Sequence, residues 1–215
     1  MIKIAPSILS ANHSILKEEI VNIEKAGADY IHIDIMDGHY VPNISFGPQI
    51  VKTIRSLTKK TLDVHLMISP VKNFIDSFAQ AGADIISFHP EADTEPLKII
   101  NLIKSLNCKV GIAIHPKIEI EKIKNYLNQI DITIVMTVVP GFGGQKFLKD
   151  QVSKISLLND IRKTNNLGFK IEVDGGINDE SSEICKKNGA DVLVAGSYIF
   201  NSCSTKYKNL IDNLR

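Results

Sequence analysis

Short apolar segments typical of β-strands alternate with stretches of helical periodicity along this whole sequence. Loop residues separate each strand-like segment from the helical pattern that follows it. The repeated order of strand and then helix predicts a parallel sheet, because parallel neighbours need a crossover connection. We predict eight strands, at residues 2–8, 30–35, 62–67, 85–89, 109–114, 132–138, 170–174 and 192–195.

A short motif recurs where a helical stretch gives way to a strand. It reads Ala26-Gly27-Ala28-Asp29, then Ala81-Gly82-Ala83-Asp84, and in a shorter form Gly189-Ala190-Asp191. Glycine can adopt the left-handed conformation that ends a helix, so each copy marks one more βα unit. Eight such units in 215 residues fit an α/β fold of the (β/α)8 TIM-barrel type, which we predict as a single domain over residues 1–215.

The alternative fold is an open, doubly wound sheet. Such a sheet usually carries a glycine fingerprint directly after its first strand. This chain has Ala5-Pro6-Ser7-Ile8-Leu9-Ser10 at that point, which favours the barrel.

Two of the predicted helices show a continuous apolar face in the sequence. Apolar residues recur at the spacing that places them on one side of a helix, and Lys, Glu and Asn fall between them. The two sets are Ile99, Leu102, Ile103 and Leu106, and Ile120, Ile123, Leu127 and Ile130. We expect both faces to be buried and the intervening residues to face solvent.

The charge balance indicates a small-molecule partner. The formal net charge is +1 without a dense cluster of Lys or Arg, so we expect neither nucleic acid nor a membrane surface as partner. Three cysteines, Cys108, Cys185 and Cys203, are too few and too scattered for a disulfide framework or a metal site. No basic and then apolar segment opens the chain, and no apolar run is long enough to span a bilayer. A cytoplasmic location is therefore expected.

The predicted strand at residues 30–35 carries polar groups on one face. Ile31, Ile33 and Ile35 alternate with His32 and Asp34, which places the imidazole and the carboxylate together on the opposite face. Burying such groups is costly unless they pair, form hydrogen bonds or hold a metal. Taken alone, this strand is equally compatible with a structural His–Asp pair in the core.

Further polar residues lie at the ends of other predicted strands. His65 belongs to the strand at 62–67, and Asp174 ends the strand at 170–174. In a TIM barrel the carboxyl ends of the strands meet at the mouth, where function is located. His32, Asp34, His65 and Asp174 would form a mixed nitrogen and oxygen shell there, suited to Zn2+, Fe2+, Mn2+ or Co2+.

Each of these residues also has a structural interpretation. His65 alone can be a hydrogen-bonded core imidazole, and Asp174 can cap the tight turn that follows it. His89 and His115 also lie near strand ends, but each precedes a proline and can simply shape a loop, so we rank both lower as ligands. His39 is expected in the loop beyond its strand.

Glycine-rich segments follow the last three predicted strands, at residues 140–145, 174–176 and 195–197. Backbone N–H groups in such loops can approach a ligand closely, and TIM barrels commonly bind phosphate there. None of the three arginines, Arg55, Arg162 and Arg215, lies at a predicted strand end. A bound phosphate would therefore depend on backbone amides, and we expect a phosphorylated metabolite as ligand.

Three of the four methionines, Met36, Met67 and Met136, also fall near the predicted mouth. Core filling is the usual role of methionine. The alternative is that polarizable sulfur lines a site where negative charge becomes delocalised.

Together, these segments resemble the ribulose-phosphate 3-epimerase family over essentially the whole chain. The motifs that carry the resemblance are Ala5-Pro6-Ser7-Ile8-Leu9-Ser10, His32-Ile33-Asp34-Ile35-Met36-Asp37-Gly38-His39-Tyr40-Val41-Pro42-Asn43, Asp63-Val64-His65-Leu66-Met67, Pro140-Gly141-Phe142-Gly143-Gly144-Gln145 and Glu172-Val173-Asp174-Gly175-Gly176. The family interconverts ribulose 5-phosphate and xylulose 5-phosphate in the pentose phosphate pathway, on a (β/α)8 barrel of the ribulose-phosphate-binding type. The resemblance implies an isomerase with one divalent metal ion per subunit.

The resemblance also implies roles for matching residues. The implied metal ligands are His32, Asp34, His65 and Asp174. The implied acid–base pair is Asp34 and Asp174. The implied substrate-binding residues are Ser7, His65, Gly141, Phe142, Gly143, Gly144, Asp174, Gly175, Gly176, Gly196 and Ser197, with Met36, Met67 and Met136 lining the enediolate. The chain departs from the family pattern at His115, where we would expect Asn before the proline.

The inversion of a carbon atom next to a ketone requires two acid–base groups, and two carboxyl groups can supply them. One ionised group removes the proton from one face, and a protonated group returns a proton to the other face. Asp34 and Asp174 come from strands that are separated around the barrel, so they can flank a sugar. A divalent ion would stabilise the enediolate as a Lewis acid.

Other functions fit parts of the pattern. A Schiff-base aldolase needs a lysine at the carboxyl end of a strand, whereas Lys3, Lys109 and Lys170 lie at amino-terminal ends. Decarboxylases on related barrels pair lysines with aspartates on strands two and three, where this chain has His and Met. A mere binding protein would not need two opposed carboxylates. A 3-epimerase of allulose 6-phosphate shares nearly all the motifs and stays open, and a homo-oligomer is expected only at the level of the family.

Overall fold

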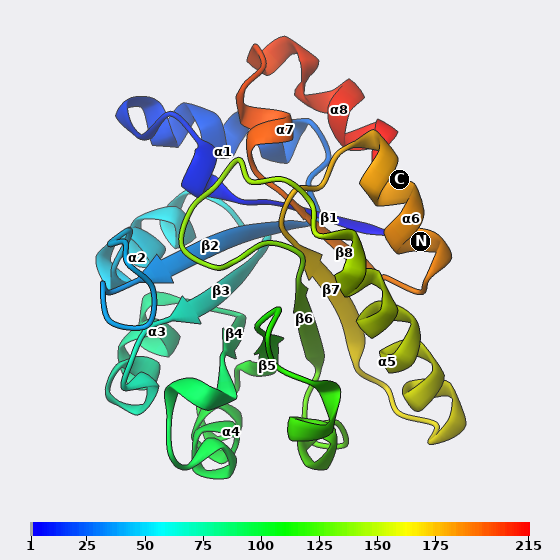
Figure 1. Cartoon of the computed structure of the whole chain (residues 1–215). Helices are drawn as coiled ribbons and strands as arrows, with labels where there is room; N and C mark the ends of the chain where they lie inside the picture. The colour runs from blue at the N-terminus through cyan, green and yellow to red at the C-terminus, as the bar shows by residue number, and fades with distance from the viewer. Residues whose placement is uncertain (1) are drawn as a thin grey trace.

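The structure, a computed structural model, describes residues 2–215. Eight parallel strands meet in the middle, and helices form a ring around them (Figure 1). The strands are β1 (Lys3–Pro6), β2 (Tyr30–Met36), β3 (Thr61–Met67), β4 (Ile85–Phe88), β5 (Lys109–Ile114), β6 (Ile132–Met136), β7 (Lys170–Asp174) and β8 (Val192–Ala195). The α-helices are α1 (Leu16–Lys25), α2 (Pro48–Leu57), α3 (Ile75–Ala81), α4 (Pro96–Ser105), α5 (Val152–Thr164), α6 (Asp179–Lys187), α7 (Ser197–Phe200) and α8 (Tyr207–Asn213). The predicted (β/α)8 TIM barrel is confirmed.

The sheet curls into a ring that is nearly closed. Neighbouring strands pair in the order β1-β8-β7-β6-β5-β4-β3-β2, so the first strand of the chain pairs with the last. Among the described residues, one parallel bridge between Ser7 and His32 joins β1 to β2. The N–H of Asp29 adds a hydrogen bond of 2.9 Å to the carbonyl of Ile4 at the same seam. The bridge brings Ser7 next to the polar face of β2.

The two faces of β2 follow the alternation in its sequence. Ile31, Ile33 and Ile35 lie in the main hydrophobic core, which also contains the buried apolar residues of the surrounding helices. His32 and Asp34 point the other way, into the barrel, and both are buried. The barrel interior is therefore polar near its mouth. A separate apolar cluster fills its amino-terminal part, formed by Ala5, Tyr30, Ile85, Ile132, Val192 and Val194.

The recurring glycine motif turns each of three helices into the next strand. Gly27, Gly82 and Gly189 have φ values of 98°, 103° and 105°, a region that glycine occupies without the steric cost of a Cβ. The aspartate two residues after each glycine accepts a hydrogen bond from the preceding strand. The pairs are Asp29 with the N–H of Ile4 (3.0 Å), Asp84 with Leu62 (2.8 Å) and Asp191 with Ile171 (2.8 Å).

All three arginines of the chain bind these same aspartates. The ion pairs are Arg215 with Asp29 (2.9 Å), Arg55 with Asp84 (2.8 Å) and Arg162 with Asp191. Each guanidinium also donates to a nearby backbone carbonyl. The arginines therefore stabilise the amino-terminal end of the barrel.

The helix predicted near residues 120–130 is wrong in type. The chain forms two 3-10 helices there, η5 (Ile120–Lys122) and η6 (Lys124–Tyr126). The apolar set itself is buried as expected, at Ile120, Ile123, Leu127 and Ile130. Ile, Asn and Tyr are weak helix formers, so tertiary packing of the apolar side chains decides the local conformation in this segment.

No helix among residues 2–215 has the length and apolar character needed to cross a membrane.

We predict that Asp191→Asn lowers the free energy of unfolding more than Asp131→Asn does. Asp131 accepts from the N–H of Val110 at 2.8 Å, as Asp191 does from Ile171. Of these two aspartates, only Asp191 also pairs with an arginine in the described structure. The expected difference is about 1 kcal/mol, because this ion pair is partly exposed. Urea unfolding followed by circular dichroism measures it, and equal losses in the two variants would contradict a stabilising role for Arg162.

Candidate active site

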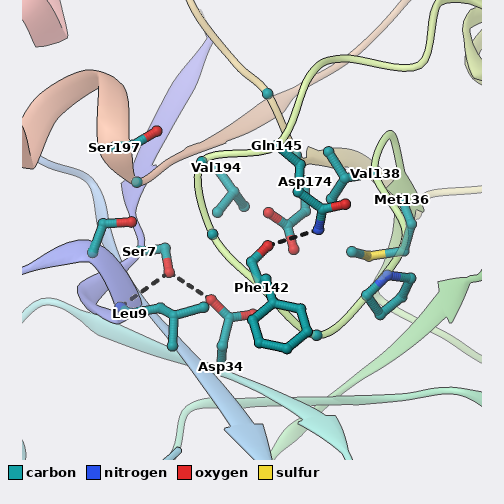
Figure 2. Close-up of a pocket in the computed structure, with 18 of the residues that line it drawn as sticks. Ser7, Leu9, Asp34, Met136, Val138, Phe142, Gln145, Asp174, Val194 and Ser197 are labelled. Atoms are coloured by element: carbon teal, nitrogen blue, oxygen red, sulfur yellow. Dashed lines mark hydrogen bonds between the residues drawn. The ribbon is translucent and has the colours of Figure 1, made fainter. Parts of the chain in front are cut away.

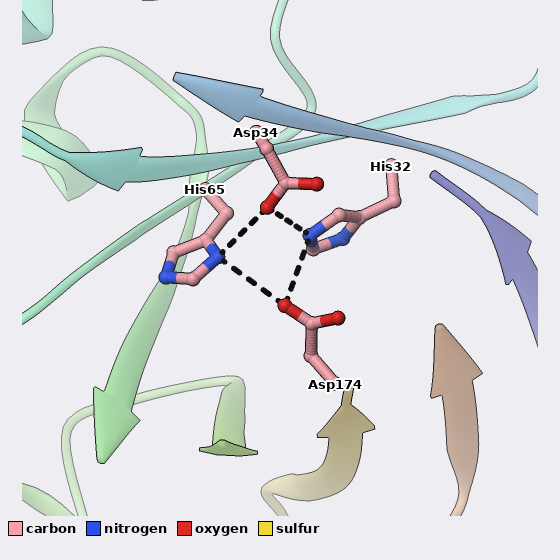
Figure 3. A group of neighbouring side chains, drawn as sticks. All are labelled: His32, Asp34, His65 and Asp174. Carbon is pink, nitrogen blue, oxygen red and sulfur yellow. Dashed lines mark ion pairs between the residues drawn. The ribbon is translucent and has the colours of Figure 1, made fainter. Parts of the chain in front are cut away.

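The pairing of β2 with β3 places the candidate ligands side by side. The facing pairs in this register are His32 and Asp63, Asp34 and His65, and Met36 and Met67. Because side chains alternate between the faces of a strand, all six point into the barrel at three successive levels. Asp174 ends β7, a strand elsewhere in the barrel, and its side chain approaches His32, Asp34 and His65 (Figure 3).

Two imidazoles and two carboxylates form a ring at the barrel mouth, with like groups at opposite corners (Figure 3). His32 Nε2 lies 3.4 Å from Asp34 Oδ1 and 3.9 Å from Asp174 Oδ2. His65 Nδ1 lies 3.4 Å from the same Asp34 oxygen and 3.7 Å from the same Asp174 oxygen. One atom of each side chain therefore faces a common centre. The structure thus brings together all four residues predicted as metal ligands.

The composition and spacing of this ring fit a divalent metal ion. His32 Nε2 and His65 Nδ1 are buried without a hydrogen-bond partner in the described structure, which is costly unless something else binds them. Four ligand atoms held tetrahedrally at about 2.0–2.2 Å from one ion are about 3.3–3.6 Å apart, close to the observed 3.4–3.9 Å. The donor types suit Zn2+, Fe2+, Mn2+ and Co2+ without choosing between them.

The surroundings separate the pKa values of the two carboxyl groups. Burial, together with the negative charge of Asp34, raises the pKa of Asp174 to about 6. Burial also opposes the ionisation of Asp34, but His32 and His65 outweigh it and hold the pKa of Asp34 well below its usual value. Two neighbouring carboxyl groups with such different proton affinities can act as an acid and a base.

Two acidic residues that the sequence analysis missed lie beneath the ring. Asp63 Oδ2 is 2.7 Å from His32 Nδ1, Glu172 Oε1 is 3.3 Å from the same nitrogen, and both side chains are fully buried. Burial and the charge of Asp63 raise the pKa of Glu172 well above its usual value. We infer that His32 donates from Nδ1 to Asp63, which leaves Nε2 free to bind a metal. Asp63 and Glu172 each precede a predicted ligand by two residues. This spacing places them on the same face of the strand as the ligand, and it is the signal that could have identified them.

A cavity lies over the ring and opens to solvent. Its wall includes the predicted substrate residues Ser7, Gly141, Phe142, Gly143, Gly144, Asp174, Gly175, Gly176, Gly196 and Ser197, and the methionines Met36, Met67 and Met136. His65, also predicted to contact substrate, is fully buried and is not part of the wall. Other lining residues were not predicted, among them Leu9, Ser10, Val138, Gln145 and Val194. Leu9, Val138 and Val194 are apolar, whereas Ser10 and Gln145 lie in quoted motifs without a predicted role.

Hydrogen bonds fix several parts of this wall (Figure 2). Ser7 Oγ donates to Asp34 Oδ2 at 2.5 Å and accepts from the N–H of Leu9 at 3.3 Å. In the segment after β6, Gln145 Nε2 donates to the carbonyl of Phe142 at 2.8 Å. It also donates to the carbonyl of Val139 at 2.7 Å. These bonds hold the segment that carries Phe142 at the edge of the cavity.

The turn after β7 requires glycine at two positions. Gly175 and Gly176 have φ values of 120° and 65°. A Cβ on Gly175 would lie 2.5 Å from a methyl group of Val138, and a Cβ on Gly176 would lie 2.6 Å from the backbone nitrogen of Phe147. Close packing alone therefore explains both glycines, and it leaves the cavity wall at this turn free of side chains.

The remaining histidines near strand ends lie outside the ring. His89 is fully buried, and its Nε2 lies 3.0 Å from His65 Nε2, so it contacts a predicted ligand without reaching the ring. His115 is half-buried, and its Nδ1 accepts from the N–H of Lys117 at 3.1 Å. His39 is exposed in the loop after β2, as expected.

Fold and site together define a class, the (β/α)8-barrel enzymes with paired carboxyl groups at a candidate divalent-metal site. Within this class, the chain belongs to the ribulose-phosphate 3-epimerase family, whose model matches residues 3–200. It is therefore an epimerase of the isomerase class, and the family resemblance of the sequence is confirmed.

Curated relatives and solved structures agree with this assignment. A ribulose-phosphate 3-epimerase from Bacillus subtilis (strain 168) is 46% identical over 209 residues, covering 96% of this chain and 95% of its own length. One from Methanocaldococcus jannaschii is 46% identical over 212 residues, covering 98% and 90%. The crystal structure of KGPDC from Streptococcus mutans has a TM-score of 0.74 at 15% identity, covering 100% and 95%, which supports the fold alone.

We predict that Asp63→Asn weakens divalent-metal binding about 10–100-fold, the usual effect of losing an outer partner of a ligand histidine. The matched variant Glu172→Gln is expected to change binding little, because burial and the charge of Asp63, which raise the pKa of Glu172, already disfavour its ionised form. Titration of the metal-free variants with Co2+, followed by visible absorption, measures both. Equal weakening in the two variants would contradict the different roles given to these neighbours of His32.

Proposed function

We propose that this protein interconverts D-ribulose 5-phosphate and D-xylulose 5-phosphate by moving the proton at C3, a reaction of the pentose phosphate pathway. The observation that carries the proposal is the ring of His32, Asp34, His65 and Asp174 at the mouth of a barrel from this family. The 46% identical relative from Bacillus subtilis bears the name of that activity.

The proposed reaction uses Asp34 and Asp174 as two bases on opposite faces of the sugar. In one direction, the ionised carboxylate of Asp34 takes the C3 proton, and the protonated carboxyl of Asp174 delivers a proton to the other face. The low pKa of Asp34 and the raised pKa of Asp174 support this division of roles. In the reverse direction the two residues exchange roles, and Ser7, which donates to Asp34 Oδ2, fixes the orientation of that carboxylate.

We propose that His32, Asp34, His65 and Asp174 hold one divalent ion per subunit, drawn from Zn2+, Fe2+, Mn2+ and Co2+. When bound, the ion supplies the positive charge that stabilises the enediolate oxygens. The nearly complete burial of the four side chains limits the access of water to these charges. His32 and His65 would bind the ion through neutral nitrogen atoms, so the ionised carboxylate would offset part of its charge.

The cavity wall supports the remaining roles. We propose that Gly141, Phe142, Gly143 and Gly144 close over the sugar, and that Met36, Met67 and Met136 line the enediolate. The phosphate is assigned to the backbone around Gly175, Gly176, Gly196 and Ser197. The three arginines lie at the other end of the barrel, which leaves backbone amides as the phosphate donors.

Four further expectations stay predictions: the single domain over residues 1–215, the cytoplasmic location, the phosphosugar partner and a homo-oligomer.

We predict that stripping the metal abolishes epimerase activity and that adding back one divalent ion restores it. Without the positive charge, a carboxylate cannot remove the weakly acidic C3 proton at a useful rate. The measurement is turnover of D-ribulose 5-phosphate by chelator-treated protein, then after separate additions of Zn2+, Fe2+, Mn2+ and Co2+. Turnover that never depends on metal would overturn the role given to the ring, and turnover only of allulose 6-phosphate would change the proposed substrate.

We also predict that Asp34→Asn and Asp174→Asn each lower kcat about 10²–10⁴-fold in samples that still contain metal. An amide can neither take nor deliver the C3 proton, whereas it keeps the shape of the carboxyl group. Metal content of each sample, measured with its turnover, separates lost proton transfer from lost metal. Asp76→Asn, at an exposed position on α3, is the control. Near-normal turnover of either ring variant would contradict the two-base mechanism.

A further inference from the structure

A row of polar side chains leads from His65 to the protein surface. His65 Nε2 lies 3.0 Å from His89 Nε2, and His89 Nδ1 lies 3.5 Å from Glu91 Oε1. Tyr40 donates a 2.8 Å hydrogen bond to the same Glu91 oxygen, and its ring lies over the His89 imidazole with centroids 4.6 Å apart. Both imidazoles are fully buried, whereas the Glu91 side chain is 30% exposed. The row connects a proposed metal ligand to an accessible carboxylate.

The contact between the two Nε2 atoms allows only two arrangements of protons for neutral imidazoles. Each such imidazole carries one N–H, and one of the facing nitrogens must donate to the other. In the first arrangement, His65 donates from Nε2 and keeps a lone pair on Nδ1, which faces the ring. In the second, His89 donates, and His65 carries its proton on Nδ1, where it blocks metal binding.

The carboxylate at the outer end favours the first arrangement. There, His89 carries its proton on Nδ1 and directs it toward Glu91, whereas in the second arrangement a nitrogen lone pair would face the negative oxygen. His89 Nδ1 is buried without a hydrogen-bond partner in the described structure, and so is His65 Nδ1. In the first arrangement, Glu91 would provide an acceptor for His89 Nδ1, and a metal ion could bind His65 Nδ1.

The environment of Glu91 agrees with this polarity. Burial opposes the ionisation of Glu91, but His89 and Tyr40 outweigh it and hold the pKa of Glu91 below its usual value. Glu91 is therefore available as an ionised acceptor.

On the basis of the metal site proposed above, we propose that His89 and Glu91 are positioning residues that hold His65 in the tautomer whose Nδ1 can bind the metal. Tyr40 holds the carboxylate of Glu91 beside His89. The negative charge of Glu91 acts through two imidazoles and makes His65 a stronger ligand. Asp63 acts on His32 in the same way, directly and without an intervening histidine.

The first test is the affinity of the full-length protein for Zn2+, measured by competition with a chelator. Glu91→Gln is expected to weaken binding about tenfold, because it removes the charge while it keeps the size of the side chain. Glu91→Asp keeps the charge and is expected to bind more tightly than Glu91→Gln. Glu95→Gln is the matched control, since Glu95 pairs with Lys98 and lies outside the row. A change of less than twofold in Glu91→Gln would overturn the proposal.

The second test detects the tautomers directly by 15N NMR of the Zn2+-loaded protein. The expected result is protonation of His65 on Nε2 and of His89 on Nδ1, which a merely structural contact would not require. Protonation of His89 on Nε2 would overturn the proposal. If Glu91→Gln does not fold, Tyr40→Phe replaces it as the test variant. It keeps the stacked aromatic ring and removes the hydrogen bond to Glu91. Unchanged Zn2+ affinity in Tyr40→Phe would then count against the role given to the row.

The outcomes also separate this inference from the proposed function. Wild-type protein that binds no Zn2+ would overturn the metal site and this inference together. Wild-type binding that Glu91→Gln leaves unchanged would overturn only the role of the row, and the epimerase proposal would stand.

Discussion

The register between β2 and β3 is the constraint on which the site depends. It sets His32 beside Asp63 and Asp34 beside His65, so that each imidazole meets a carboxylate across one strand spacing. A shift of β2 by one residue would turn His32 and Asp34 toward the helices and bring the isoleucines of β2 into the barrel. The apolar face of β2, packed in the main core, makes such a shift costly. The hydrophobic core thus fixes the position of the polar ring.

The architecture was predictable because its signals are local. Strand periodicity and the glycine motif at three helix ends identified the βα units, and the structure confirms β5, β7 and β8 at the expected residues. The ends of β1 and β6 were predicted too long, since the chain leaves the sheet for a 3-10 helix at residues 8–10 and for the glycine-rich segment after Met136. The segment after β5 differs because tertiary packing, which no local pattern encodes, outweighs its helical periodicity.

The site was predictable where a residue type and a strand end coincide. His32, Asp34, His65 and Asp174 meet as expected. Asp63 and Glu172 were missed although they share the inward face and lie in the quoted motifs, because the sequence does not show which side chain each one contacts. Both contact His32, and this contact forms only when β2, β3 and β7 are assembled. Glu91 and Tyr40 were missed for a related reason, since 51 residues separate them in the chain.

The two ends of the barrel use charge in opposite ways. At the amino-terminal end, arginines neutralise the aspartates that accept strand N–H groups, so the charges there are already paired. At the mouth, two buried imidazole nitrogens have no hydrogen-bond partner among residues 2–215 and face two carboxylates. Arginine at the mouth would pair with those carboxylates and remove both the bases and the metal ligands. Confining arginine to the far end therefore keeps the carboxylates of Asp34 and Asp174 available, and under the proposed function it assigns the phosphate to backbone groups instead.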